Sequence, residues 1–217
     1  MKNVNRHIPM TESLKRFCLV IYMILVFPCA LIITVVSIFI GPSTLTDGDT
    51  KSVMFLISAW AGVLIPVLYC IKKKNNRNKK LKQIVSLLRS EDRFSPSNHH
   101  QVFNVGHDKY LGIDSKLGTI LYVHIVKKDV IDVIGLTMRD WTDRELQGSI
   151  LRIYTRMPDM PVLSLSMNKS KDIFDMLGAM SHKNYSEPYP NEPWSLYVKR
   201  QSKLVQFEHD VVVPQAI

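Results

Sequence analysis

The sequence predicts a membrane-anchored α+β protein, in which a two-helix transmembrane hairpin is followed by a small antiparallel β-rich domain with one packed helix. Three observations predict this class: two long charge-free apolar segments, basic residues concentrated beside them, and a later change to strand-like periodicity. The chain has 217 residues, of which 46% are hydrophobic, and a formal net charge of +9. The hydrophobic fraction excludes a disordered basic tail, and the counts of nine glycines, eleven prolines and three cysteines exclude a collagen-like chain and a disulfide scaffold.

The two apolar segments are residues 17–40 and 53–71, which run for 24 and 19 residues without a charged side chain. At about 1.5 Å per residue, helices of these lengths extend over roughly 36 and 28 Å, close to the ~30 Å of a membrane hydrocarbon core. Two buried core helices are the alternative, but such helices rarely carry apolar side chains on every side in a chain of this size. We therefore expect a transmembrane hairpin over 17–71, with a polar turn at 41–52.

The charge is distributed unevenly around these segments. The basic N-terminal segment 1–16 carries +3, the turn 41–52 carries −1 and residues 72–82 carry +7, whereas residues 83–217 contain 16 basic and 16 acidic side chains. Lysine and arginine beside a span resist translocation. The pattern predicts a multi-pass protein of the cytoplasmic membrane with both termini in the cytoplasm.

The basic run is also the predicted contact with an anionic membrane surface. A nucleic-acid partner is not expected, because the run lacks the aromatic side chains on which bases stack. The predicted membrane-surface residues are Lys72, Lys73, Lys74, Arg77, Lys79, Lys80 and Lys82.

Residues 72–100 are predicted to form a basic juxtamembrane helix and a linker, with Ile84, Leu87 and Leu88 at helical spacing. From residue 101 the apolar period changes from 3.6 to 2, which favours antiparallel strands with a buried face. The domain 101–217 is therefore β-rich. The predicted strands are 110–114, 118–127, 128–137, 149–157 and 161–167.

A helix is predicted after Ser170, because an apolar stripe at i, i+3, i+4 and i+7 follows a good N-cap residue. The Pro-rich segment 186–194 is expected to be irregular, and late strands are expected within 195–200 and 203–207. A pleckstrin-homology-like split barrel is one arrangement with this order of elements, among many.

Catalytic or metal-binding groups do not stand out. His99, His100, His107 and Asp108 match no known zinc spacing, and His124 is expected to be a half-buried strand residue. The three cysteines lie in the apolar segments, and phosphate-binding or nucleophile-elbow motifs do not occur in the sequence. The acidic side chains of 138–145 are interpreted as ion-paired with the neighbouring arginines. We expect neither an enzyme nor a cofactor or metal.

Four aromatic residues are the candidates for a partner interface, because such side chains are common interface anchors. They lie near the exposed segments expected at 114–118, 138–145 and 185–194, although packing into the core explains them as well. The candidates are Trp141, Tyr185, Tyr189 and Trp194.

The layout as a whole resembles a known family. The chain has a basic N-terminus, two apolar segments, the run KKKNNRNKKLK at 72–82, and a β-rich domain that contains LGIDSKLGTILYV and LTMRDWTDREL. This layout is similar to that of the ExcA-type entry-exclusion (surface-exclusion) proteins of conjugative plasmids of the I-complex. The resemblance implies a plasmid-encoded inner-membrane protein that blocks redundant conjugative DNA transfer into its cell. It also implies recognition of a donor conjugation component, a large membrane protein of the TraY type.

Three functional hypotheses follow. The first is an exclusion protein that acts by protein–protein recognition. The second is a membrane-tethered scaffold or regulatory module that binds a cytoplasmic partner or anionic lipid. The third, a membrane-anchored enzyme, lacks a convincing nucleophile or metal set. The sequence leaves open the oligomeric state and how a cytoplasmic domain would meet a donor protein.

Overall fold

The computed structural model describes residues 10–40, 50–104, 108–186 and 189–214. The chain divides into two compact units, one formed by residues 5–76 and the other by residues 77–217. Each unit is described by itself.

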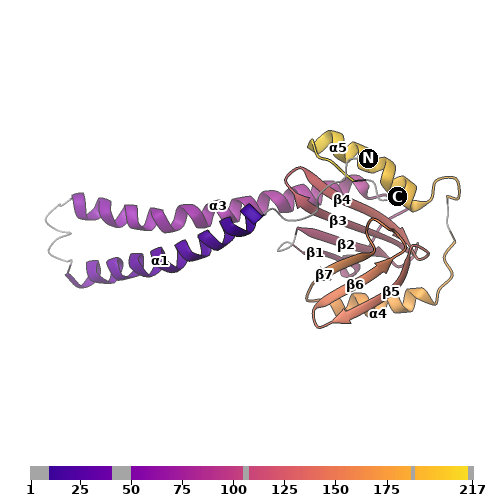
Figure 1. Cartoon of the computed structure of the whole chain (residues 1–217), viewed down its shortest axis with the longest axis horizontal. Helices are drawn as coiled ribbons and strands as arrows, with labels where there is room; N and C mark the ends of the chain where they lie inside the picture. Colours follow the sequence, from indigo (N-terminus) through magenta and orange to yellow (C-terminus); the bar gives the residue numbers. More distant parts are fainter. Residues whose placement is uncertain (1–9, 41–49, 105–107, 187–188, 215–217) are drawn as a thin grey trace. The chain divides into compact units, whose positions relative to one another are not determined.

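The first unit is a pair of helices, α1 (Met10–Ile40) and the greater part of α3 (Thr50–Leu88) (Figure 1). Among the side chains that the structure describes, two hydrogen bonds join the helices. The hydroxyl of Tyr22 donates to the carbonyl oxygen of Gly62 at 2.8 Å, and the indole Nε1 of Trp60 donates to Oγ1 of Thr34 at 2.9 Å. The Thr34 hydroxyl in turn donates to the carbonyl of Ala30, so polar groups are satisfied between two largely apolar helices.

The prediction of two membrane spans is wrong. In the part of the chain that the structure describes, no helix combines the length and the apolar character that crossing a membrane requires. In α3, the described side chains from Trp60 onward are apolar only as far as Ile71, where the basic residues Lys72–Lys74 begin within the same helix. The finding overturns the transmembrane hairpin 17–71 and, with it, the multi-pass inner-membrane location with two cytoplasmic termini.

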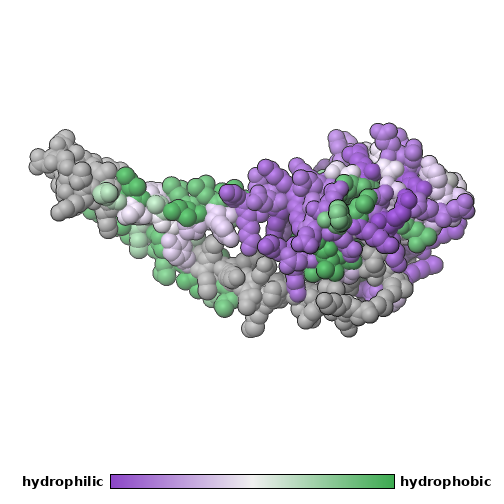
Figure 2. Space-filling model, turned by 90° about the horizontal axis from the view of Figure 1, so that it is seen from above, coloured by the Kyte–Doolittle hydropathy of each residue, from purple (hydrophilic) through white to green (hydrophobic). Residues whose placement is uncertain are grey.

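The described side chains of the helix pair are nevertheless apolar and largely exposed. Figure 2 shows hydrophobic side chains gathered on the visible face of α1 and α3. Ile24 and Ile32 of α1 and Ile65 and Leu68 of α3 each keep more than 60% of their surface exposed. The helix pair therefore buries little of its own apolar surface.

The second unit is an α+β domain with two antiparallel sheets. The four-stranded sheet has the order β1 (Gln101–Asn104), β2 (Lys109–Asp114), β3 (Thr119–Lys127), β4 (Val130–Thr137). The three-stranded sheet has the order β5 (Trp141–Gln147), β6 (Ile150–Thr155), β7 (Val162–Ser166). All neighbouring strands are sequential and antiparallel, as the alternation of apolar residues indicates. A short 3₁₀ helix, η1 (Asn98–His100), precedes β1.

The four-stranded sheet is buried on both faces. One face packs against the last turns of α3 and against α5 (Trp194–His209), and its core contains Leu121 and Val123. The other face packs against the three-stranded sheet and α4 (Ser170–Ser181), with Ile120 and Tyr122 in the core. Burial on both sides explains why β3 and β4 have nearly continuous apolar sequences.

The three-stranded sheet has only one covered face. Strands β6 and β7 alternate between buried and exposed residues, and α4 lies along β5 and β6 (Figure 1). The exposed face carries Glu145, whose carboxylate accepts hydrogen bonds from Arg152 and from the Tyr154 hydroxyl. These hydrogen bonds lower the pKa of the Glu145 carboxyl.

The C-terminal part differs from the expected late strands. Residues 194–209 form α5, and their buried side chains Trp194, Val198, Ser202 and Val205 follow a helical spacing that places them on one face. The two five- or six-residue runs read as strands are parts of this one helix. The domain thus has two helices after the strands, α4 and α5, where one was expected.

Gly135 lets α5 approach β4 closely. A Cβ atom built at this position would lie 2.6 Å from Cγ2 of Val198, well inside van der Waals contact. We expect Gly135→Ala to lower the free energy of unfolding by about 1–3 kcal/mol through overpacking. Val198→Ala alone is also expected to destabilise, because it opens a cavity.

Urea unfolding of both single variants and of the double variant measures the coupling. The double variant should lose less stability than the sum of the two single losses, because Val198→Ala removes the closest contact of the new methyl group, although Cβ of residue 198 and Nε1 of Trp194 stay at 2.9 and 3.0 Å. Strictly additive losses would show that Gly135 and Val198 do not limit the helix–sheet distance.

Candidate functional site

Three turns of the α+β domain meet at one end of the four-stranded sheet. The register pairs Thr119 with Thr137, so the turn before β3 and the turn after β4 lie at the same end of the sheet. The chain that follows α4 lies beside these two turns, and the three segments line an open pocket of about 190 Å³. The pocket is lined by Leu117, Gly118, Thr137, Met138, Arg139, Lys183, Asn184, Tyr185 and Ser186.

The first wall is the β2–β3 turn, residues 114–118, which is organised by a buried carboxylate. Asp114 is 3% exposed and accepts hydrogen bonds from the backbone N–H groups of Ser95, Lys116 and Leu117 at 2.8, 2.9 and 3.2 Å. Gly118 closes the turn with φ +71°, a left-handed conformation that favours glycine. The backbone of the wall is therefore fixed by its own sequence.

Tyr185 covers this turn. A Cβ atom at Gly118 would lie 2.5 Å from the Tyr185 ring, so only glycine leaves room for the aromatic side chain there. The Tyr185 hydroxyl donates to the carbonyl oxygen of Ser115 at 3.0 Å. Burial and, to a smaller extent, the charge of Asp114 raise the pKa of the Tyr185 hydroxyl. This contact attaches the chain that follows α4 to the β2–β3 turn.

The second wall is the turn between β4 and β5. Oδ2 of Asp140 accepts hydrogen bonds from the backbone N–H and the hydroxyl of Thr137, both at 2.7 Å. The carboxylate of Asp140 is thus engaged inside the turn. Arg139 is exposed, and within the described part of the chain its guanidinium makes no ion pair. The expected local ion pairing of 138–145 does not include this arginine.

The third wall is the end of α4 and the residues after it. The backbone N–H of Lys183 donates to the carbonyl of Met180 at 3.0 Å, which closes the last turn of the helix. The Lys183 ammonium lies 5.1 Å from the centre of the Tyr185 ring, within the range of a cation–π contact. Lys183 is exposed, as are Asn184 and Ser186 beside it.

The pocket is therefore small and basic. Its lining contains two cationic side chains, Arg139 and Lys183, and no carboxylate. Pockets for drug-sized ligands and cofactors typically have ~300–1,000 Å³, so a volume of about 190 Å³ fits a single side chain or a small anion better than a nucleotide. The arrangement is suited to binding and offers no nucleophile–base pair.

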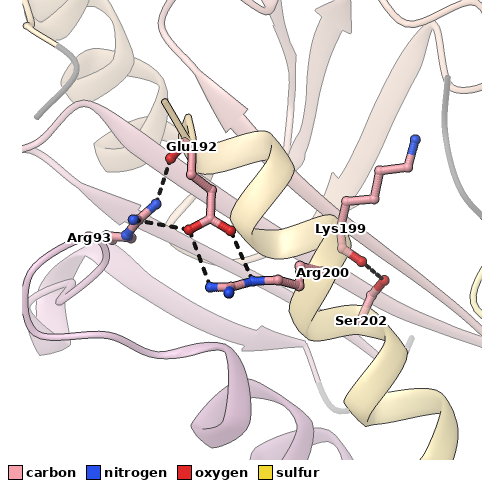
Figure 3. A network of polar contacts seen from close by, with 5 residues as sticks. All are labelled: Arg93, Glu192, Lys199, Arg200 and Ser202. Carbon is pink, nitrogen blue, oxygen red and sulfur yellow. Dashed lines mark hydrogen bonds and ion pairs between the residues drawn. The ribbon is translucent and has the colours of Figure 1, made fainter. Parts of the chain in front are cut away.

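The chain between α4 and α5 is held a second time by an arginine cluster, defined here as Arg93, Glu192 and Arg200 (Figure 3). Arg93 donates to the carbonyl oxygen of Glu192 at 2.6 Å and pairs with its carboxylate at 3.1 Å. Arg200 of α5 pairs with the other carboxylate oxygen at 2.9 Å. The Arg93 guanidinium also stacks over the rings of Tyr189 and Tyr197, at 4.1 and 4.8 Å.

The four predicted interface aromatics have different positions. Trp194 is 1% exposed, stacks on Phe94 and donates from Nε1 to the carbonyl of Ile120 at 3.0 Å, so it belongs to the core. Trp141 is 8% exposed and also packs in the core. Tyr189 is 38% exposed beneath Arg93, and Tyr185 lines the pocket. The structure thus brings Tyr185, and not the two tryptophans, to the candidate site.

The basic run 72–82 is not a uniformly free surface. Arg77 forms an ion pair with Asp108, and Lys80 is partly buried and donates to the carbonyl of Lys128 at 3.4 Å. Burial lowers the pKa of Lys80. The side chains of Lys72, Lys73, Lys74, Lys79 and Lys82 are exposed on α3.

The histidines form no metal site in the described residues, where no group of three or more His, Cys, Asp or Glu side chains could hold a metal ion. His107 lies outside the described residues, so the set of His99, His100, His107 and Asp108 is described only in part. His124 faces Asp132 across β3 and β4 at 3.9 Å and is a partly buried strand residue.

Sequence reasoning did not single out Arg139, Lys183 or Arg93. It did mark the segments 114–118, 138–145 and 185–194 as exposed, and the pocket lies where these three segments meet. The signal that was available is the turn chemistry: an acidic residue followed by glycine at 114–118, and threonine with aspartate at 137–140. Consecutive antiparallel strands at 118–127 and 128–137 place the first two turns at the same end of the sheet, but nothing local in the sequence places the chain after α4 beside them.

The fold and the pocket define an α+β domain with a small basic pocket at one end of its four-stranded sheet. Comparison with known families gives the identity: the model of the exclusion-determining protein family matches residues 4–216, nearly the whole chain. The chain belongs to this family, and its general role is entry exclusion. The resemblance to plasmid entry-exclusion proteins is thereby confirmed, whereas the ExcA-type subtype stays a prediction. No curated protein and no solved structure matches the chain.

The arginine cluster makes an unequal prediction for its two arginines. The side chain of Arg93 is 14% exposed and that of Arg200 is 63% exposed. Arg93→Gln should lower the free energy of unfolding by about 1.5–3 kcal/mol, because it removes charge-assisted hydrogen bonds in a shielded position. Arg200→Gln should cost only about 0.2–1 kcal/mol, as for an exposed ion pair. Chemical denaturation of the two variants measures the difference, and equal losses would contradict the assigned roles.

Proposed function

We propose that the chain excludes redundant plasmid entry by binding a protein component of the donor conjugation machinery, without catalysis. Family membership supports entry exclusion as the general role. The pocket supports protein recognition as the mode, because its volume and lining suit the insertion of a partner side chain.

The observation that carries the proposal is the convergence of two β turns and the chain after α4 at one end of the four-stranded sheet. Asp114 and Asp140 fix the two β turns by backbone hydrogen bonds, and Tyr185 attaches the third segment to the first. A preformed surface loses little conformational entropy on binding, which favours affinity and specificity. Loops on a rigid scaffold are also where recognition residues concentrate.

Filling the pocket should abolish exclusion without unfolding the protein. Ser186 is an exposed residue of the pocket wall, so Ser186→Trp adds bulk at the entrance and removes no buried contact. Recipient cells that express the wild-type chain should take up less plasmid from a matching donor than cells with an empty vector. Cells that express Ser186→Trp should take up at least about tenfold more plasmid than cells that express the wild-type chain.

Gln147→Trp, at an exposed position on β5 that does not line the pocket, is the matched control and should exclude as well as wild type. An unrelated donor should transfer equally into all four recipients. Equal uptake from the matching donor with and without the wild-type chain would remove the proposed function, and full exclusion by Ser186→Trp would remove the pocket from it.

A further inference from the structure

We infer that the pocket receives an acidic side chain, the carboxylate of an Asp or Glu of the partner protein. This inference deepens the proposed function and rests on it for the identity of the ligand as part of a protein. It is carried by the charge, the size and the donor groups of the pocket.

Two of the nine lining residues, Arg139 and Lys183, are cationic, and none of the nine is acidic. Arg139 and Lys183 contribute two cations from two different walls. The nearest acidic residues in sequence, Asp114 and Asp140, have their carboxylates occupied by hydrogen bonds inside their own turns. A partner group that enters the pocket therefore meets two cations, and an anion is the complementary charge.

The size of the pocket limits the anion. The pocket volume of about 190 Å³ is below the ~300–1,000 Å³ that is typical of pockets for drug-sized ligands and cofactors. A carboxylate with two or three carbon atoms fits this space, whereas a nucleotide does not. The apolar side chains of Leu117 and Met138 are suited to the methylene groups of such a side chain.

The donors match a carboxylate in kind. The planar guanidinium of arginine binds carboxylates through two parallel hydrogen bonds, and the ammonium of lysine acts as a point charge. The amide of Asn184 and the hydroxyl of Ser186 are further donors on the third wall. Inorganic phosphate shares this chemistry, so the experiment must separate the two anions.

The binding test uses the full-length, isotopically labelled chain and glutarate as the probe for an acidic side chain. Glutarate should produce saturable NMR shifts at the backbone amides of Gly118, Met138 and Asn184, and the uncharged analogue glutaramide should not. Arg139→Gln should weaken glutarate binding by at least about tenfold. Lys116→Gln, which removes an exposed lysine of the same β2–β3 turn outside the lining, should leave it unchanged.

Three outcomes would overturn the inference: shifts that do not saturate, equal shifts with glutaramide, or unchanged affinity in Arg139→Gln. A phosphate affinity more than about tenfold above that of glutarate would assign the pocket to a free phosphate group and would also overturn it.

A mating experiment separates this inference from the proposed function. Arg139→Glu should lose exclusion of the matching donor, because it reverses the charge. Arg139→Lys should keep most of the exclusion, because it keeps the positive charge; the remaining loss comes from the missing bidentate hydrogen bonds. If the wild-type chain does not exclude, the proposed function fails and the glutarate titration still decides the chemistry of the pocket. If Arg139→Glu excludes as well as wild type, the function stands and the inference fails.

Discussion

Burial of the four-stranded sheet on both faces is the constraint on which the rest of the α+β domain depends. Tyr110, Leu121 and Val123 point to one core, while Ile120 and Tyr122 point to the other. Tyr110 is fully buried and Tyr122 is 2% exposed, so little water reaches either layer, and this burial raises the pKa of both hydroxyls. A sheet enclosed in this way leaves only its edges and turns for recognition. The turns at the end of the sheet where Thr119 pairs with Thr137 form the pocket.

The chain between α4 and α5 connects the two cores and completes the pocket at the same time. Tyr185 lies on the β2–β3 turn, Arg93 holds Glu192, and Trp194 enters the core with its indole N–H bonded to Ile120. The pocket wall is thus tied to the positions of both helices. The three walls of the pocket are preorganised because a different polar side chain, Asp114, Asp140 or Tyr185, fixes each of them.

Much of the β-rich domain could be predicted from the sequence, because strands β2–β4, β6 and β7 have clear period-2 or continuous apolar patterns. The strands predicted at 195–200 and 203–207 are wrong. Leu196, Tyr197 and Val198 are consecutive and apolar, as in a strand, and only the longer spacing from Trp194 to Val205 indicates a helix. The prediction of membrane spans was based on the full apolar runs 17–40 and 53–71. The helices of the described residues do not have the length and apolar character that a membrane span requires. The sequence predicts exposed segments at 114–118, 138–145 and 185–194 but not the pocket, because the contact of Tyr185 with Ser115 joins residues 70 positions apart in the sequence.

The most direct measurement is site-specific photo-crosslinking during mating. Recipient cells express the full chain with a photoreactive amino acid in place of Ser186, and only the donor proteins carry an isotope label. The expected result is a cross-link from position 186 to one donor-encoded protein with a matching donor, and its absence with an unrelated donor. The same probe at Gln147, on β5, should give no such product. A cross-link of equal yield from both positions, or none from position 186 in cells that exclude the donor, would contradict recognition through this pocket.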